Sequence, residues 1–320
     1  MKCFKKYFDS QEKRPCMWCG VHCLGSLLIR PASLLSSCLL IVIAGASLAM
    51  GCQPLALDGN DEEEIAAPVV MTAVDVELEA SQPFRRVDIF FFEGTGIKAM
   101  CHHEKIVLHE PESALKTLLM VPETASHVVA FANTSREFND KALSRYDVVQ
   151  QLEYEFVDDS PEFPLMSAEA DIETAVVRIS VRPVMCTVRL VEVCNLMEGY
   201  ELVEEPRIRL RDMNMSAKPL QKSAFYPAGV LDAGEWLPLP CDVGYYAMKP
   251  DARLYCYPNE TSADSIGSHT LLEMECIIQG ERRNICIELP PFGRESMLEV
   301  SLVIEGPWEY SHSVRVTAPS

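Results

Sequence analysis

The sequence predicts an all-β protein built from β-sandwiches, and two observations support this prediction. From residue 69 onward, many short segments alternate apolar and polar residues with a period of two, the pattern of strands with one buried face. These segments follow one another at short intervals with turn residues between them, and a single stretch has a helical pattern. Many strands with few helices are typical of sheets that pack face to face.

The first 51 residues have the pattern of a bacterial lipoprotein signal. A basic region precedes an uncharged apolar run at residues 34–49, and the small residue Gly51 stands directly before Cys52. The run is shorter than the ~20 residues that a membrane-spanning helix needs. We therefore expect cleavage between Gly51 and Cys52 and a diacylglyceryl group on the Cys52 thiol, because several acyl chains together hold a protein on a bilayer. Apart from this covalent lipid, no cofactor is expected.

Alternatives remain open at this end of the chain. The lipoprotein pattern usually has leucine three residues before the cysteine, whereas Ala49 stands there and Leu48 lies one position further out. An ordinary cleaved signal or a single membrane anchor also fits the apolar run. Met17 is a possible initiator, because residues 17–52 already make a complete signal with Arg30 as the basic flank.

Residues 52–68 form a linker that carries a cluster of acidic side chains. The acidic residues follow the cysteine closely and are Asp58, Asp61, Glu62, Glu63 and Glu64. A run of charges is often a solvated spacer. This one also resembles the acidic cluster that directs surface lipoproteins of Bacteroidetes to the outer leaflet, and the resemblance implies that the folded part lies outside the cell.

The charge balance excludes one class of partner. The chain has 28 Lys+Arg against 47 Asp+Glu, a formal net charge of −19, and loss of the basic signal makes the remainder more acidic. Nucleic-acid binding draws much of its affinity from Lys and Arg side chains that neutralise phosphates. We therefore expect no nucleic-acid partner.

We expect a first sandwich over residues 69–160. Alternating residues predict strands at 74–80, 86–92, 105–108, 116–121 and 127–132. Gly94 lies in a turn that requires a positive φ. Residues 135–155 have a helical stripe with Ser135 as its N-cap, and the proline-containing segment 158–164 marks the expected domain boundary.

We expect a second sandwich over residues 161–320. Its predicted strands lie within 175–193, 207–211, 245–248, 253–257, 269–278, 284–289 and 297–304. Pro183 cannot donate to a strand ladder and so marks an edge or a break, while Gln279 to Glu281 form a hairpin turn. Residues 311–317 form either the final strand of this sandwich, which we favour, or a strand donated to a neighbouring subunit.

The sequence predicts neither catalysis nor a metal site. The histidines lie in no nucleophile or metal signature. His102 and His103 are adjacent, and adjacent residues on a strand point to opposite faces. Gly94 and Gly96 lack the third glycine and the following helix of a nucleotide loop.

The cysteines are expected to be mainly core residues. Cys186, Cys276 and Cys286 lie in apolar alternating runs, where a cysteine behaves as a small hydrophobic residue. One or two disulfides remain possible, because an exported protein reaches an oxidising compartment.

Several short motifs follow the signal and the linker in order. They are VDIFFFEG at 87–94, HVVAFAN at 127–133, PLMS at 164–167, VRPV at 181–184, YCYPNE at 255–260 and IEG at 304–306. In this order they resemble the fimbrial anchor and accessory lipoproteins of Bacteroidales, the FimB/Mfa2-like group. The resemblance covers nearly all of the chain after the signal. It implies two tandem transthyretin-like β-sandwiches, no catalysis, and anchoring or assembly of pili on the outer membrane with pilin and accessory subunits as partners.

The resemblance also implies a mechanism, strand complementation, in which an open sheet edge accepts a strand from a neighbouring subunit. Polymerising fimbrillins need proteolysis at a basic site, and Arg85 with Arg86 is the candidate here. An anchor would instead keep its lipid and remain uncut, and we favour the anchor or accessory role. The segment before Pro258 is unusually rich in cysteine and tyrosine, which leaves anchor, accessory subunit and tip open.

A surface glycan-binding lipoprotein is the alternative from a different class. Such proteins present aromatic side chains to sugars, and the candidates are Trp236, Trp308, Tyr245 and Tyr246. These residues lie near strand ends, where aromatic packing is also ordinary.

Overall fold

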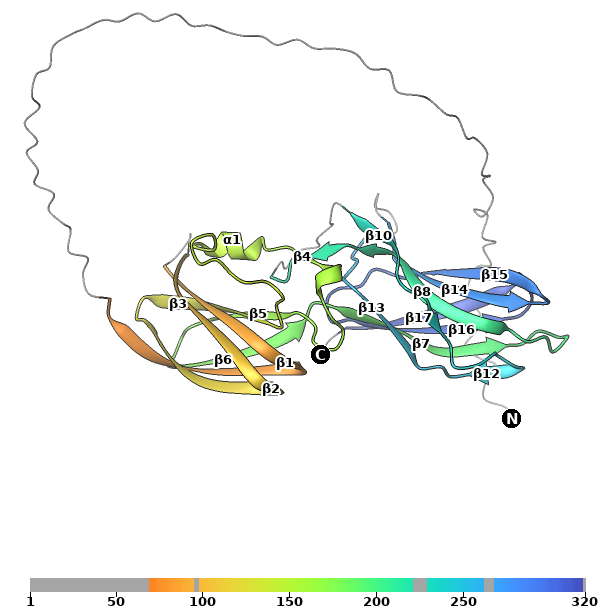
Figure 1. Cartoon of the computed structure of the whole chain (residues 1–320), viewed down its shortest axis with the longest axis horizontal. Helices are drawn as coiled ribbons and strands as arrows, with labels where there is room; N and C mark the ends of the chain where they lie inside the picture. Colours follow the sequence, from red (N-terminus) through yellow and green to blue (C-terminus); the bar gives the residue numbers. More distant parts are fainter. Residues whose placement is uncertain (1–68, 95–97, 221–228, 262–267, 319–320) are drawn as a thin grey trace, which may run out of the picture. The chain divides into compact units, whose positions relative to one another are not determined.

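The computed structural model describes residues 69–94, 98–220, 229–261 and 268–318, and these residues belong to one compact unit. Strands make up nearly all of its regular structure, which confirms the all-β prediction (Figure 1). Among the described residues, no helix has the length and apolar character needed to cross a membrane.

The first group of elements is β1 (Met71–Glu93), β2 (Ala99–Pro122), β3 (Ala125–Ala132), α1 (Tyr146–Gln150), β4 (Tyr154–Glu155), β5 (Met166–Asp171) and β6 (Val176–Pro183). The second group is β7 (Cys186–Asn195), β8 (Glu204–Asn214), β9 (Ser216–Ala217), β10 (Val230–Ala233), β11 (Leu237–Pro238), β12 (Tyr246–Met248), β13 (Ala252–Cys256), β14 (Leu271–Ile278), β15 (Glu281–Glu288), β16 (Met297–Ile304) and β17 (Tyr310–Thr317).

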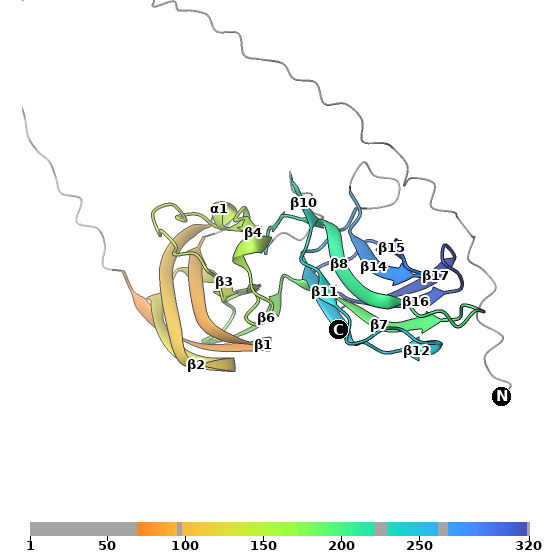
Figure 2. The ribbon, with the colours of Figure 1, turned by 45° about the vertical axis from the view of Figure 1, so that its right-hand side comes forward.

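The first sheet has the strand order β2-β1-β3-β5-β6 and closes on itself, because β1 also pairs with β6 in parallel. The first half of β1 lies between β2 and β6, and its second half lies between β2 and β3. The long β1 and β2 curve together, as Figure 2 shows. The strands predicted at 74–80 and 86–92 are thus two halves of one bent strand.

A bulge at the bend of β1 changes which side chains of the strand point inward. Val74, Val76 and Leu78 point into the sheet's interior before the bend, whereas Val87 and Ile89 do so after it. The inward positions change from even to odd numbers, and the pairing with β2 shifts register on both sides of Phe84. A register shift of one residue moves every following side chain to the other face of a sheet. We call the apolar residues enclosed by the closed sheet the inner core.

The bulge also buries the opposite face of the second half of β1. Phe90 and Phe92 point away from the inner core and join Val129 and Phe131 of β3 in a separate cluster, the outer core. The other members of the outer core come from later segments and are Leu143, Val149, Tyr154, Leu165, Val184, Met185, Ala217, Leu220 and Tyr257. Each fully buried phenylalanine contributes roughly 1.5–3 kcal/mol, so this cluster holds the covering segments firmly.

The helix predicted over 135–155 is wrong except for α1. Ser135 is not a cap, and the residue before α1, Arg145, makes no side-chain capping bond. Asn139 instead forms a local turn, since its Oδ1 accepts from the Lys141 N–H at 3.1 Å and its carbonyl oxygen accepts from the Ala142 N–H. Asparagine bonds of this kind compete with helix formation. The apolar residues of the predicted stripe do have a structural role. Leu143 and Val149 belong to the outer core, and Phe138 and Tyr146 pack against it.

The second group of strands forms two sheets with one core between them. Their orders are β10-β8-β14-β15, with β11 also on β8, and β12-β7-β16-β17, with β13 also on β7. Alternate residues of each strand point inward, such as Val188 and Leu190 on β7. The predicted break at Pro183 is confirmed, since β6 ends there. The hairpin turn is also confirmed, because Gln279 and Gly280 have positive φ between β14 and β15.

The boundary expected between Ser160 and Pro161 does not coincide with a change of sheet. The chain after Pro161 first adds β5 and β6 to the sheet of β1 and β3, and the second group of sheets begins with β7. Pairing with β5 covers an edge of β3 that would otherwise be exposed. The prolines of 158–164 therefore mark an irregular connection within the first group.

Arg294, in the connection between β15 and β16, links the two groups through main-chain carbonyl oxygens. Its guanidinium donates to Pro219 O (2.5 Å), Arg182 O (2.6 Å) and Ser167 O (3.2 Å). Burial lowers the pKa of this guanidinium. One side chain thus satisfies main-chain acceptors of β5, β6 and the segment after β9.

Replacing Arg294 with alanine is expected to lower the free energy of unfolding by about 2–4 kcal/mol, because main-chain carbonyl oxygens of three segments lose a charged donor. The matched control is Arg315→Ala, which removes an arginine that is 77% exposed and bonded to Glu299. We expect that control to cost less than about 1 kcal/mol. Urea unfolding followed by circular dichroism measures both, and equal losses would contradict the assigned role of Arg294.

Candidate interaction surfaces

The predicted lipidation and export residues lie outside the described residues. These are the cleavage pair Gly51 and Cys52 and the acidic cluster Asp58, Asp61, Glu62, Glu63 and Glu64. The described chain begins at residue 69, immediately before β1. The tether and the sorting label therefore stay predictions from the sequence.

The predicted protease site lies at the bend of β1. The Arg85 N–H donates to Asn133 Oδ1 (3.0 Å), and the Asn133 N–H donates to the Arg86 carbonyl oxygen (2.9 Å). The Arg86 side chain donates to Asp88 and Glu137, and the Arg85 guanidinium lies 4.4 Å from the Phe163 ring centroid. Both arginines are thus fixed by main-chain hydrogen bonds and by side-chain contacts. A protease must therefore unfold this bend before it can cut there.

Next to this bend lies a buried polar network centred on Asp88. Asp88 is fully buried, and Arg86 Nε donates to it at 2.7 Å. His103 Nε2 lies 3.3 Å from Asp88 and His103 Nδ1 lies 2.7 Å from Asp140. The His103 ring stacks on Phe90, with centroids 4.2 Å apart. Burial lowers the pKa of His103, but the hydrogen bonds to the two carboxylates outweigh burial and raise the pKa overall.

The contacts of this network indicate a role in holding the fold together. An imidazole between two carboxylates resembles part of a hydrolytic triad, but a triad also needs a nucleophile beside the base. The two nitrogens of this ring contact Asp88 and Asp140. Among the described residues, no group of three or more His, Cys, Asp and Glu side chains is arranged to hold a metal ion.

The last strand, β17, leaves an open edge on its sheet. It pairs antiparallel with β16 along its whole length, which confirms the favoured assignment of 311–317 as a final strand. No described strand pairs with its other edge. Val300 and Leu302 of β16 are fully buried, whereas Val316 of β17, on the same inward face, is 38% exposed. The core is therefore incompletely covered at this edge, and an added strand would cover it.

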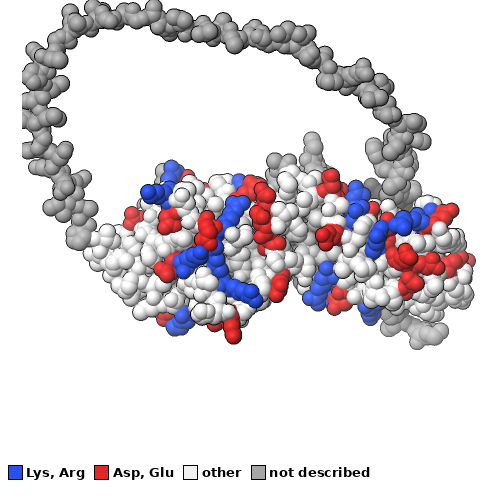
Figure 3. All heavy atoms as spheres, in the orientation of Figure 1, with Lys and Arg blue, Asp and Glu red and all other residues white. Residues whose placement is uncertain are grey.

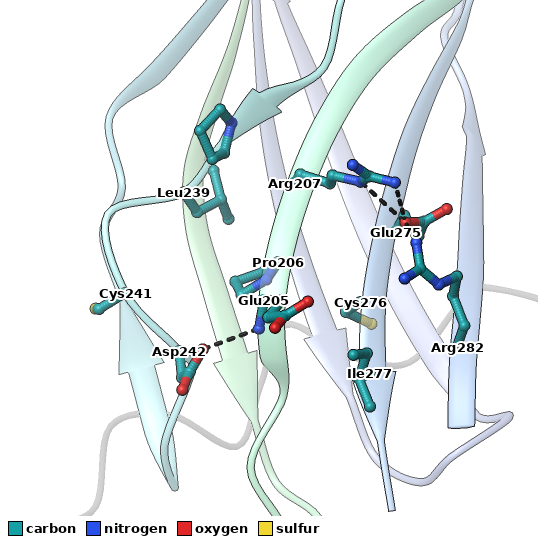
Figure 4. Close-up of a pocket in the computed structure, with 11 residues that line it drawn as sticks. Glu205, Pro206, Arg207, Leu239, Cys241, Asp242, Glu275, Cys276, Ile277 and Arg282 are labelled. Carbon is teal, nitrogen blue, oxygen red and sulfur yellow. Dashed lines mark hydrogen bonds and ion pairs between the residues drawn. The ribbon is translucent and has the colours of Figure 1, made fainter. Parts of the chain in front are cut away.

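A pocket of about 310 Å³ lies at one end of the β8–β14 pair (Figure 4). The pairing shifts register between Glu275 and Ile277 of β14, and Glu205 of β8 has a φ of 48°. Arg207 and Arg282 both point to Glu275, at 2.5 and 2.6 Å. Two further carboxylates, Glu205 and Asp242, also line the pocket, and Asp242 Oδ1 accepts the Glu205 main-chain N–H at 2.9 Å.

The aromatic residues considered for sugar binding have different surroundings. The Trp236 ring lies under the Arg207 and Arg209 guanidinium groups, at 4.7 and 4.1 Å. Trp308 has Arg283 over its ring at 3.6 Å. Tyr245 and Tyr246 are exposed and contact each other. Tyr245 also contacts Tyr200, a residue that the sequence did not single out because its neighbours come from a distant segment.

Charged residues are mixed over the described surface. On the face shown in Figure 3, Lys and Arg lie beside Asp and Glu, and no extended basic area is visible there. Ion pairs across neighbouring strands account for part of this mixing, such as Lys116 with Glu77 (2.8 Å) and Arg207 with Glu275. This surface gives no support to a nucleic-acid partner.

Comparison with solved structures places the fold among fimbrial and adhesion proteins of Bacteroidales. A candidate cell adhesion protein of Parabacteroides distasonis superposes with a TM-score of 0.60 at 13% identity, over 76% of this chain and 96% of the other. Fimbrilin of Porphyromonas gingivalis gives 0.53 at 10% identity, over 73% and 90% of the two chains. The tip fimbrial protein Mfa3 of the same species gives 0.52 at 9% identity, over 77% and 99%. No protein-family model and no curated protein matches the chain. At these identities the comparison establishes a shared fold, in keeping with the all-β class expected from the sequence.

The Asp88 network predicts how stability depends on pH. Because the folded-state pKa of His103 is raised, the stabilisation from its protonation is fully present below the ordinary histidine pKa of about 6.5 and is lost as pH rises through the folded-state value. His103→Gln should therefore reduce the melting temperature most at acidic pH and least at alkaline pH. Asp140→Asn, which keeps the imidazole and neutralises one partner, should give a smaller change of the same sign. A pH-independent difference between wild type and His103→Gln would contradict this linkage.

Proposed function

We propose that this chain is a non-enzymatic surface lipoprotein that anchors or assembles fimbriae through β-strand contacts with a pilin subunit. The observation that carries the proposal is the fold, which fimbrial proteins share over about three quarters of this chain. The lipoprotein signal ending at Cys52 and the acidic linker supply the tether and the expected outer-leaflet location.

The open edge of β17 is the acceptor that we assign to the pilin strand. Main-chain amides and carbonyls at such an edge provide affinity for an added strand, and partly exposed inward residues provide apolar contact. Val316 is one such residue, at 38% exposure. Because β17 is itself paired with β16 over eight positions, this edge is already formed before a partner arrives.

If this chain instead polymerised as fimbrillins do, it would be cut at Arg85 and Arg86. A cut there would separate the first half of β1, which lies between β2 and β6 and carries the buried Val76. Its loss would leave a groove with an apolar floor. We favour the uncut form, because both arginines are held within the bend and a tether at Cys52 requires the segment to stay attached.

The alternative is a surface glycan-binding lipoprotein. Arginine guanidinium groups lie over the Trp236 ring and over the Trp308 ring. Trp308 nevertheless remains 75% exposed, and Tyr245 and Tyr246 are exposed as well, so these three aromatics are the candidates for contact with a sugar. Retention of the protein on a glycan column without a pilin would favour this alternative.

Val316→Lys is expected to reduce the pilin recovered with this protein about tenfold or more, because a charged side chain on an edge strand opposes strand addition. The matched control is Val107→Lys, at a position that is 65% exposed on the edge strand β2. Pull-down of the full chain from solubilised outer membranes, with quantitation of the co-purified pilin, measures the effect. Equal recovery with the two variants would refute the assignment to β17, and absence of any pilin from the wild-type sample would refute the fimbrial role.

Cys52→Ser is expected to abolish acylation and to move the protein from the membrane fraction to the soluble fraction, because a hydroxyl cannot carry the thioether. Cells that carry this variant in place of the wild-type gene should release their pili into the medium. Metabolic labelling with palmitate, fractionation and counting of cell-bound pili provide three separate readouts. Unchanged labelling and membrane association would show that the tether lies elsewhere.

A further inference from the structure

Three tyrosines form an exposed aromatic cluster at the ends of β7 and β12. Tyr200 lies between β7 and β8, Tyr245 precedes β12, and Tyr246 begins it. The ring centroids of Tyr200 and Tyr245 are 4.6 Å apart, and those of Tyr245 and Tyr246 are 4.4 Å apart. Their exposed fractions are 69%, 39% and 67%. We call these three residues the tyrosine cluster. Grouped exposed aromatics of this size are typical of interaction sites rather than of plain surface.

The two segments that carry the cluster are fixed to each other by a buried amide. Asn195 is fully buried, and its Nδ2 donates to Glu201 O (2.8 Å) and Val243 O (3.1 Å). Val203 and Val243 also exchange two main-chain hydrogen bonds, of 3.1 and 2.9 Å. The rings are therefore held in position before any ligand arrives, which lowers the cost of ordering them on binding.

The backbone of the cluster is strained. Tyr200 and Tyr246 have φ values of 59° and 83°, in the left-handed region that bulky residues seldom adopt. Glycine would fit these positions without strain. Strain of this kind persists where the surrounding structure imposes it, and it is frequent at functional sites.

The chain segments that carry the cluster are mainly acidic. Residues 192–206 and 239–248 contain neither lysine nor arginine, and the basic residues Arg207 and Lys249 follow them directly. Their acidic side chains are Glu192, Glu198, Glu201, Glu204, Glu205 and Asp242. Aromatic faces attract cations through their quadrupole, and nearby carboxylates add a negative field.

We propose that the tyrosine cluster is a docking site for a basic segment of another protein. An ammonium or guanidinium group lies over the tyrosine faces, and further cations of the same segment pair with the surrounding carboxylates. A second copy of this chain does not suit the site, because the chain carries a formal net charge of −19. This inference is independent of the tether and of strand addition at β17, so it stands or falls separately from the proposed function.

The test measures binding of a fluorescein-labelled peptide of alternating lysine and glycine to the full chain in non-ionic detergent, by fluorescence anisotropy. A peptide of alternating glutamine and glycine is the uncharged control. The double variant Tyr200→Ala, Tyr246→Ala should weaken binding of the lysine peptide about tenfold, and Tyr200→Phe, Tyr246→Phe should bind as wild type does, because the rings remain. The matched control is Trp308→Ala, which removes an aromatic that is 75% exposed and lies away from the cluster in sequence. That variant should bind as wild type does.

A second pair of substitutions avoids any change to the rings. Glu198 and Glu204 are both exposed, and Glu198→Gln with Glu204→Gln should weaken binding of the lysine peptide several-fold and reduce its salt dependence. The proposal is overturned if the lysine peptide does not bind, or if the glutamine peptide binds equally well. Equal binding to every variant would also overturn it, because the peptide would then be responding to the general acidity of the protein. Tyrosine-dependent retention of glycans without retention of the lysine peptide would assign the cluster to sugars instead.

Discussion

The bend of β1 is the constraint on which the rest of the structure depends. A bulge around Phe84 changes which residues of the strand point inward, and it leaves the run from Ile89 to Phe92 buried on both faces. A strand that is apolar on both faces must be covered on both. The closed sheet covers one face, and residues from the connection after β3, from β9 and from the end of β13 cover the other. The outer core therefore joins parts of the chain that are far apart in the sequence.

Two buried charged groups reinforce this arrangement in different ways. Arg294 is held by neutral carbonyl oxygens, whereas Asp88 is held by Arg86 and His103. A buried charge is tolerated where hydrogen bonds replace its lost water. In both places the partners come from different strands or connections, so the polar contacts specify which segments meet and the apolar contacts supply most of the free energy.

The alternating pattern predicted the strands well because alternation reports directly on a half-buried sheet. It failed where tertiary packing replaced local structure. The stripe around Phe138 looks helical, but those side chains cover the outer core from an irregular segment that Asn139 turns. The placement of β5 and β6 was also missed, since the sequence does not state which earlier strand a new strand will join. Arg294 and Tyr200 have no local signal at all, because the role of each depends on partners that are distant along the chain.

The position of β1 between two neighbours has a mechanical consequence under the proposed tether at Cys52. Tension on the linker enters the folded part at residue 69 and runs along the axis of β1. The hydrogen bonds from β1 to β2 and β6 lie across that axis. They are therefore loaded together in shear and are not peeled apart one after another, which is the geometry in which a sheet best resists extraction of a strand. This geometry suits the anchoring role proposed above, in which a filament would pull on the folded part against its tether.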